Sequence, residues 1–139
     1  MYRYLEKIAT ADLAFEAEAE SLEKLFEEGA KALTDAMVDI KGIRPRIKKT
    51  VRLVESSVER LFYNWLEELV FVKDAELLLF SKFDVKIREE GKYHLEAVMH
   101  GEKLKKRHEQ KIDVKAITLH MFEIKKKGSL WYARVVVDI

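Results

Sequence analysis

The hydrophobic positions of the chain follow two periods, one typical of strands and one typical of helices. Residues 13–20 alternate apolar side chains with Glu, which predicts a strand with one solvent-exposed face. The alternation predicts this strand even though Glu and Ala are weak strand formers. Residues 2–5 predict a shorter strand before it. Apolar residues then recur at three- and four-residue steps, which predicts helices over about 22–37 and 56–73.

Both predicted helices follow a serine that can cap the first turn: Ser21 before the first, and Ser56 or Ser57 before the second. The apolar stripes should pack on one β-layer. Their largest side chains, which we expect to be buried, are Phe26, Leu33, Phe62, Trp65 and Leu69.

The remaining segments favour extended structure. The predicted elements are a strand over about 46–54, a hairpin of 83–87 and 93–99 around Glu90-Gly91, a short helical turn over Val114–Thr118, a strand near 119–126, a turn at Gly128-Ser129 and a last strand from Leu130 to Asp138. This order predicts an α+β fold with two main helices packed on a mostly antiparallel β-sheet layer. The length of 139 residues predicts a single domain over residues 1–139.

Composition excludes several classes of protein. Hydrophobic residues make up 48% of the chain and charged residues 37%, and there is no Cys, so neither a disulfide framework nor a thiolate site exists. No stretch approaches the ~20 apolar residues that span a bilayer, and the N-terminus has no signal-peptide pattern. We therefore expect a cytoplasmic protein without a membrane partner.

Charge is distributed unevenly along the chain. Residues 1–40 carry a net charge of −6, residues 41–99 carry +2 and residues 100–139 carry +5, within an overall charge of +1. If folding keeps these segments apart, the protein has an acidic and a basic face. This pattern indicates a charged partner without identifying it.

No self-sufficient catalytic apparatus is visible. The five glycines never cluster as a phosphate-binding loop requires, and no serine stands in a nucleophile elbow. Of the four histidines, His94 and His100 share strand parity, but six strand residues separate them by ~20 Å, too far to share an ion. We therefore favour the interpretation that each histidine, including His108 and His120, either has hydrogen-bond partners within the fold or is exposed to solvent.

Two basic groups either contact phosphates or are simply solvated. The run Glu102–His108 has no interleaved aromatic side chains, which favours a solvated loop over a strong RNA site. The same two interpretations apply to a second group, made up of Arg44, Arg46, Lys48, Lys49 and Arg52. The simplest interpretation of Lys125–Lys127 is a solvent-exposed turn.

Asp12 and Asp138 are expected at strand ends. Asp12 follows the Ala9-Thr10-Ala11 bend, and Asp138 ends the strongly apolar last strand, one position before Ile139. Carboxylates gathered with a main-chain or terminal oxygen suit a hard cation such as Ca²⁺ or Mg²⁺. On the residues alone, a local turn former at Asp12 and an exposed end at Asp138 remain favoured.

Several motifs, in order along the whole chain, resemble those of the archease family. They are Thr10-Ala11-Asp12, the helix start Ser21–Glu27, Asn64–Leu69, His100-Gly101-Glu102, Arg107-His108, Val114–His120 and the closing Val137-Asp138-Ile139. The chain departs from the family pattern at Ala9, where a His is usual, at Ala14 and at Ala19 or Glu20, where glycines are common, and at Leu119, where a Tyr is usual. None of these departures removes a carboxylate.

The resemblance implies an accessory protein rather than an enzyme. Archeases activate the GTP-dependent tRNA-splicing RNA ligase by promoting guanylylation of its active-site histidine and multiple turnover. By resemblance, a divalent cation (Ca²⁺ or Mg²⁺) is assigned to Asp12, Asp138 and a main-chain oxygen of Ile139, and ligase activation to Lys115. Some members instead modify the solubility or specificity of a tRNA cytosine methyltransferase. The tRNA itself is an indirect partner in both cases.

Three other functions stay open. A stand-alone metal hydrolase would turn over GTP or RNA by itself, and an RNA chaperone would bind tRNA with a steep salt dependence. A methyltransferase chaperone would bind that enzyme without affecting ligase guanylylation. For Lys115, the alternative is an ordinary surface lysine on a short helix.

Overall fold

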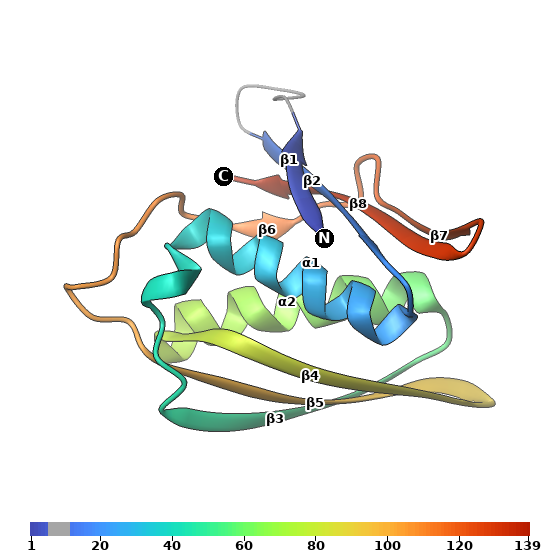
Figure 1. Cartoon of the computed structure of the whole chain (residues 1–139), viewed down its shortest axis with the longest axis horizontal. Helices are drawn as coiled ribbons and strands as arrows, with labels where there is room; N and C mark the ends of the chain where they lie inside the picture. Colours follow the sequence, from blue (N-terminus) through green and yellow to red (C-terminus); the bar gives the residue numbers. More distant parts are fainter. Residues whose placement is uncertain (6–11) are drawn as a thin grey trace.

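Two helices lie between two antiparallel sheets in the computed structural model, which describes residues 1–5 and 12–139 (Figure 1). The predicted Ala9-Thr10-Ala11 bend lies outside the described residues. The elements are β1 (Tyr2–Leu5), β2 (Asp12–Ala19), α1 (Leu22–Met37), a 3-10 turn η1 (Ile40–Gly42), β3 (Ile47–Glu55), α2 (Val58–Glu76), β4 (Leu78–Glu90), β5 (Lys92–Lys103), β6 (Ala116–Ile117), β7 (Glu123–Lys127) and β8 (Leu130–Asp138).

The first sheet has the strand order β1-β2-β8-β6, with β7 also paired to β8, and the second has the order β3-β5-β4. The α+β class and the antiparallel pairing are confirmed, but the prediction of a single β-layer is wrong. Each helix is apolar around enough of its circumference to bury side chains against both sheets. None of the described helices is long and apolar enough to cross a membrane.

The predicted helix caps and core are confirmed. Ser21 accepts a hydrogen bond from the Lys24 amide, and Ser57 accepts one from the Arg60 amide. All five side chains predicted to be buried are at most 4% exposed. The indole N–H of Trp65 on α2 donates a 3.0 Å hydrogen bond to the main-chain oxygen of Phe26 on α1, which fixes the two helices side by side.

The β4–β5 hairpin turns at Gly91, as predicted, where φ is +70°. Its strands are longer than predicted, and β4 is irregular between Phe80 and Lys82. A Cβ atom on Gly101 would lie 1.8 Å from the main-chain oxygen of Leu79, so only glycine fits opposite this irregularity.

Two local predictions near the end of the chain are wrong. Val114–Thr118 contains the two-residue strand β6 (Ala116–Ile117) rather than a helical turn, because the amide of Thr118 donates to the main-chain oxygen of Val136 and that of Ile117 to the Glu67 carboxylate. The strand predicted near 119–126 begins only at Glu123. Before it, Met121 turns the chain at φ +55°.

Candidate functional site

Asp12 and Asp138 lie directly opposite each other in the antiparallel ladder between β2 and β8. Opposed residues of such a ladder point to the same face of the sheet, with Cβ atoms about 4.5–5.5 Å apart. The structure therefore brings together two of the three predicted metal ligands, although they stand at opposite ends of the sequence. The third predicted ligand, Ile139, is the residue directly after Asp138.

The side-chain alternation of the two strands sets the direction of this pair. Phe15, Val135 and Val137 point inward and are at most 1% exposed. Asp12 and Asp138 have the opposite parity, so they belong to the outer face of the five-stranded sheet. Both residues are partly exposed there, which leaves their carboxylates open to solvent ions.

Lys115 is held beside the pair by its backbone. Its amide donates a 2.8 Å hydrogen bond to the main-chain oxygen of Asp138, while the residue itself is exposed. Ala116 is the strand partner of Asp138 on the side opposite β2. The structure thus places Asp12, Asp138 and Lys115 around one sheet end.

Helix α2 anchors the Lys115 segment from the inside. Tyr63 donates its hydroxyl to the main-chain oxygen of Ile117 at 3.3 Å, and the Glu67 carboxylate accepts the Ile117 amide at 3.0 Å. Further along α2, the Lys73 ammonium donates hydrogen bonds to the Asp113 carboxylate at 3.1 Å and to the main-chain oxygen of Val114 at 3.3 Å. These contacts fix the segment that carries Lys115 without using the Lys115 side chain.

The donor chemistry of the Asp pair fits a hard cation. Neither Asp12 nor Asp138 makes an ion pair within 4 Å with any described Lys, Arg or His. Directly opposed like charges destabilise a sheet, and a bound cation relieves that repulsion. Residues 1–5 and 12–139 contain no group of three or more His, Cys, Asp or Glu side chains that could hold a metal ion.

A buried charged network forms a second polar centre that the sequence did not predict. Glu102 is 2% exposed and His108 is 5% exposed, so the ends of the predicted solvated loop are instead part of the interior. The Glu102 carboxylate pairs with Arg107, accepts the Arg44 amide at 2.6 Å and lies 3.0 Å from Nε2 of His108. Because Nδ1 of His108 accepts the Lys105 amide, the proton sits on Nε2 and is donated to Glu102.

The electrostatics of Glu102 follow from these donors. Burial raises the pKa of the Glu102 carboxyl, but the hydrogen bonds from the Arg44 amide, Arg107 and His108 outweigh burial and hold the pKa at about 2. The network ties the loop after β5 to the segment before β3. Its role is structural, and the spacing of Glu102 and His108 within a charged run gave no signal of burial.

The other histidines do not join the Asp pair. His94 and His100 lie on the outer face of the three-stranded sheet, and His120 is exposed beyond β6. The interpretation of satisfied or exposed histidines therefore describes all four.

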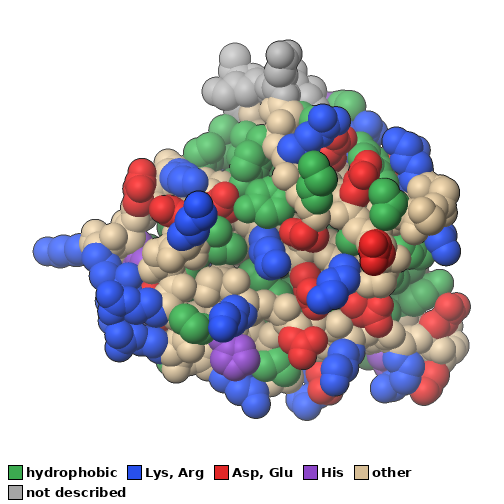
Figure 2. Space-filling model, in the orientation of Figure 1, with side chains coloured by type: hydrophobic (Ala, Val, Ile, Leu, Met, Phe, Trp, Pro, Cys, Tyr) green, Lys and Arg blue, Asp and Glu red, His purple; other side chains and the backbone are tan. Residues whose placement is uncertain are grey.

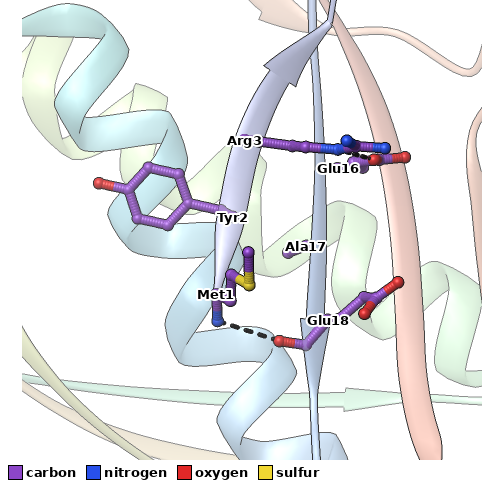
Figure 3. A pocket seen from close by; sticks show the side chains of 6 residues that line it. All are labelled: Met1, Tyr2, Arg3, Glu16, Ala17 and Glu18. Carbon is purple, nitrogen blue, oxygen red and sulfur yellow. Dashed lines mark hydrogen bonds and ion pairs between the residues drawn. The ribbon is translucent and has the colours of Figure 1, made fainter.

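A shallow hollow at the start of β1 is lined by polar groups that satisfy each other. Arg3 reaches across to Glu16, and the N-terminal ammonium of Met1 donates to the main-chain oxygen of Glu18 at 3.0 Å (Figure 3). This hollow lies at the end of β2 away from Asp12, so it is not part of the candidate site.

The model of the Archease protein family matches residues 2–139. The chain belongs to the archease family.

Individual archeases agree over nearly the full length. "Protein archease" of Methanothermobacter thermautotrophicus is 40% identical over 131 residues, covering 94% of both chains, and that of Pyrococcus abyssi is 41% identical over 133 residues, also covering 94% of both. The solution structure of Methanobacterium thermoautotrophicum protein 1598 superposes with a TM-score of 0.88 at 37% identity, covering 99% of this chain and 98% of that one.

A more distant archease shares the fold. The crystal structure of an archease from Thermotoga maritima, described as a possible chaperone, has a TM-score of 0.66 at 21% identity and covers 99% of both chains. The archease resemblance of the sequence motifs is therefore confirmed, and so is the two-helix α+β architecture.

Proposed function

We propose that this archease is an accessory protein that activates a GTP-dependent tRNA-splicing RNA ligase, promoting guanylylation of the ligase and multiple turnover. The observation that carries the proposal is the register of Asp12 with Asp138, with Lys115 hydrogen-bonded to the same residue. In this proposal the sheet end carrying these three residues faces the nucleotide pocket of the ligase.

The residues have separate tasks in this proposal. Asp12 and Asp138 hold a divalent cation, Ca²⁺ or Mg²⁺, together with a main-chain oxygen of Ile139. Such a cation supplies charge stabilisation to a phosphoryl group. Lys115, with its main chain fixed, extends its ammonium toward the ligase or a phosphate. The protein itself performs no catalytic cycle.

The test is a guanylylation time course of the cognate ligase with and without this protein. Asp12→Asn and Asp138→Asn should each abolish the stimulation. Asp84→Asn is the matched control, because Asp84 is also an exposed strand carboxylate but lies on the other sheet. Stimulation that survives in both site variants, or that is lost equally in the control, would refute the shared site.

The alternative is that the protein acts as a chaperone or specificity modulator of a tRNA cytosine methyltransferase. One observation favours a protein partner of this kind: Leu119 is 71% exposed and lines a hollow of about 230 Å³ with Phe122 and Tyr63. Under this alternative the protein would form a complex with the methyltransferase, Leu119→Asp would weaken that complex, and ligase guanylylation would be unaffected.

A further inference from the structure

The outer face of the β3–β5–β4 sheet is uncovered. Figure 1 shows both helices on its inner side and no element on its outer side. Inward positions such as Val51, Val85 and Leu95 are buried, so their sequence neighbours form the outer face. Five of these outward residues are exposed cations: Lys48, Arg52, Lys82, Lys86 and Arg88.

The same face carries the carboxylates Asp84, Glu90 and Glu96, which balance only part of this charge. Arg52 pairs with Glu96 at 3.1 Å, and Arg88 pairs with Glu90 at 2.9 Å. Lys48, Lys82 and Lys86 make no ion pair within 4 Å with any carboxylate in the described parts of the chain. Figure 2 shows Lys and Arg side chains, with acidic ones between them, along the lower rim of the molecule, where this sheet lies.

The three unpaired lysines are widely spaced. Lys48 and Lys82 occupy the two ends of one row across the sheet, with His100 between them, so two strand spacings or about 10 Å separate their backbones. Lys86 lies four residues beyond Lys82 along β4, about 13 Å away. A single phosphate ion cannot reach all three, whereas an extended polyanion can.

The outer face of the five-stranded sheet differs in how its cations are paired. There Arg3 pairs with Glu16, and Glu123 pairs with Lys125 at 3.0 Å and with Arg134 at 3.9 Å. Lys127, which has the same outward parity as Lys125, makes no ion pair and instead lies 4.9 Å from the centre of the Tyr132 ring. Among the described strand residues, the outer face of the three-stranded sheet thus has three lysines without an ion pair, and that of the five-stranded sheet has one.

We propose that the outer face of the β3–β5–β4 sheet binds the phosphate backbone of RNA, with Lys48, Lys82 and Lys86 as the phosphate contacts. Charge complementarity points to a polyanion, and the choice of RNA rests on the proposed function. No Phe, Tyr or Trp occupies an outward position between Lys48–Val54, Lys82–Arg88 and His94–His100, and the outward rings of these ranges are those of His94 and His100, so the contacts of this face are mainly with phosphates. Recognition is therefore independent of sequence.

The test is fluorescence anisotropy of a short labelled single-stranded RNA between about 50 and 200 mM salt. Three phosphate contacts predict that affinity falls about 20-fold over this range, from a slope of about −0.7 per contact. The triple variant Lys48→Gln, Lys82→Gln, Lys86→Gln should lose at least tenfold in affinity at the low salt, and its slope should be shallower by about 2.

The matched control neutralises three lysines on the other sheet: Lys125→Gln, Lys126→Gln, Lys127→Gln. It changes the net charge by the same amount and should keep most of the affinity. Equal losses in the two triple variants, or no binding by the wild type at low salt, would overturn the proposal. All six residues are exposed, so both variants should fold, which thermal unfolding verifies.

A second measurement separates this inference from the proposed function: ligase guanylylation in the absence of RNA. Lost RNA affinity with unchanged guanylylation supports RNA binding by this face. Lost guanylylation with unchanged RNA affinity would show that the face docks an acidic protein surface, which overturns the proposal. If the wild type binds RNA through these lysines but fails to stimulate guanylylation, the proposed function falls and the RNA site stands.

Discussion

The main-chain amide of Lys115 and the main-chain oxygen of Asp138 are joined by a 2.8 Å hydrogen bond. This bond and the adjacent pairing of Ala116 with Asp138 make the segment before β6 an extension of the sheet. The Lys115 side chain takes no part in either contact. Its position is therefore set by the backbone, while its ammonium remains available to a partner.

Lys115→Ala should leave stability within about 0.5 kcal/mol of the wild type, because no described contact of the fold uses the side chain. In contrast, we expect it to weaken ligase activation across a titration. Lys126→Ala, an exposed lysine on β7, is the control and should activate normally. Undiminished activation by the Lys115 variant would return this residue to an ordinary surface role.

The Asp pair has a consequence for stability that does not depend on the ligase. In a chelating buffer, Asp138→Asn should be as stable as the wild type or more stable by up to about 1 kcal/mol, since it removes a repulsion between opposed like charges. With Ca²⁺ or Mg²⁺ at about 100 times the dissociation constant, the wild type should gain about 2.7 kcal/mol and the variant much less. Thermal unfolding with and without each cation measures both effects.

Asp84→Asn is again the control and should respond to cations as the wild type does. A cation-induced gain of equal size in the wild type and in Asp138→Asn would place the bound ion elsewhere.

The core predicts a contrast between the two tryptophans. Trp65→Phe removes the hydrogen bond to Phe26 and leaves a cavity between the helices, so it should lower the free energy of unfolding by roughly 2–4 kcal/mol. Trp131 on β8 is only partly buried, so Trp131→Phe should lower the free energy of unfolding clearly less. Denaturant unfolding compares the two variants, and equal losses would contradict the role of Trp65 as the link between the helices.

The sequence predicted the features that local patterns determine. The helices followed from apolar stripes and from serine caps at Ser21 and Ser57, and the hairpin followed from alternation around Gly91. The division into two sheets was missed, because it depends on which strands pair across long separations. A local pattern does not contain that information.

In the candidate site, too, the sequence predicted some features, and others depend on strand pairing and burial. The family resemblance selected Asp12 and Asp138, but only the β2–β8 register places them opposite each other. The helical turn expected at Val114–Thr118 failed because Glu67 and β8 take up its backbone donors. Likewise, Glu102 looked solvated because a charged run carries no sign that its members bury and satisfy one another.

The buried network around Glu102 predicts how stability depends on pH. The folded-state pKa of Glu102, about 2, lies below the ordinary value of 4.5, so folding favours the carboxylate. The resulting stabilisation is fully present above pH 4.5 and is lost as the pH falls from about 4.5 to about 2. Glu102→Gln removes this titration and leaves Arg107 without its carboxylate, which should cost roughly 2–4 kcal/mol at neutral pH.

The measurement is the free energy of unfolding of wild type and variant at a series of pH values. The difference between them should shrink as the pH falls through this window, because protonation removes from the wild type the same charge that the variant lacks. Glu109→Gln, an exposed carboxylate seven positions along, should follow the wild type throughout. A constant difference between wild type and Glu102→Gln down to pH 2 would mean that the carboxylate charge of Glu102 does not stabilise the fold.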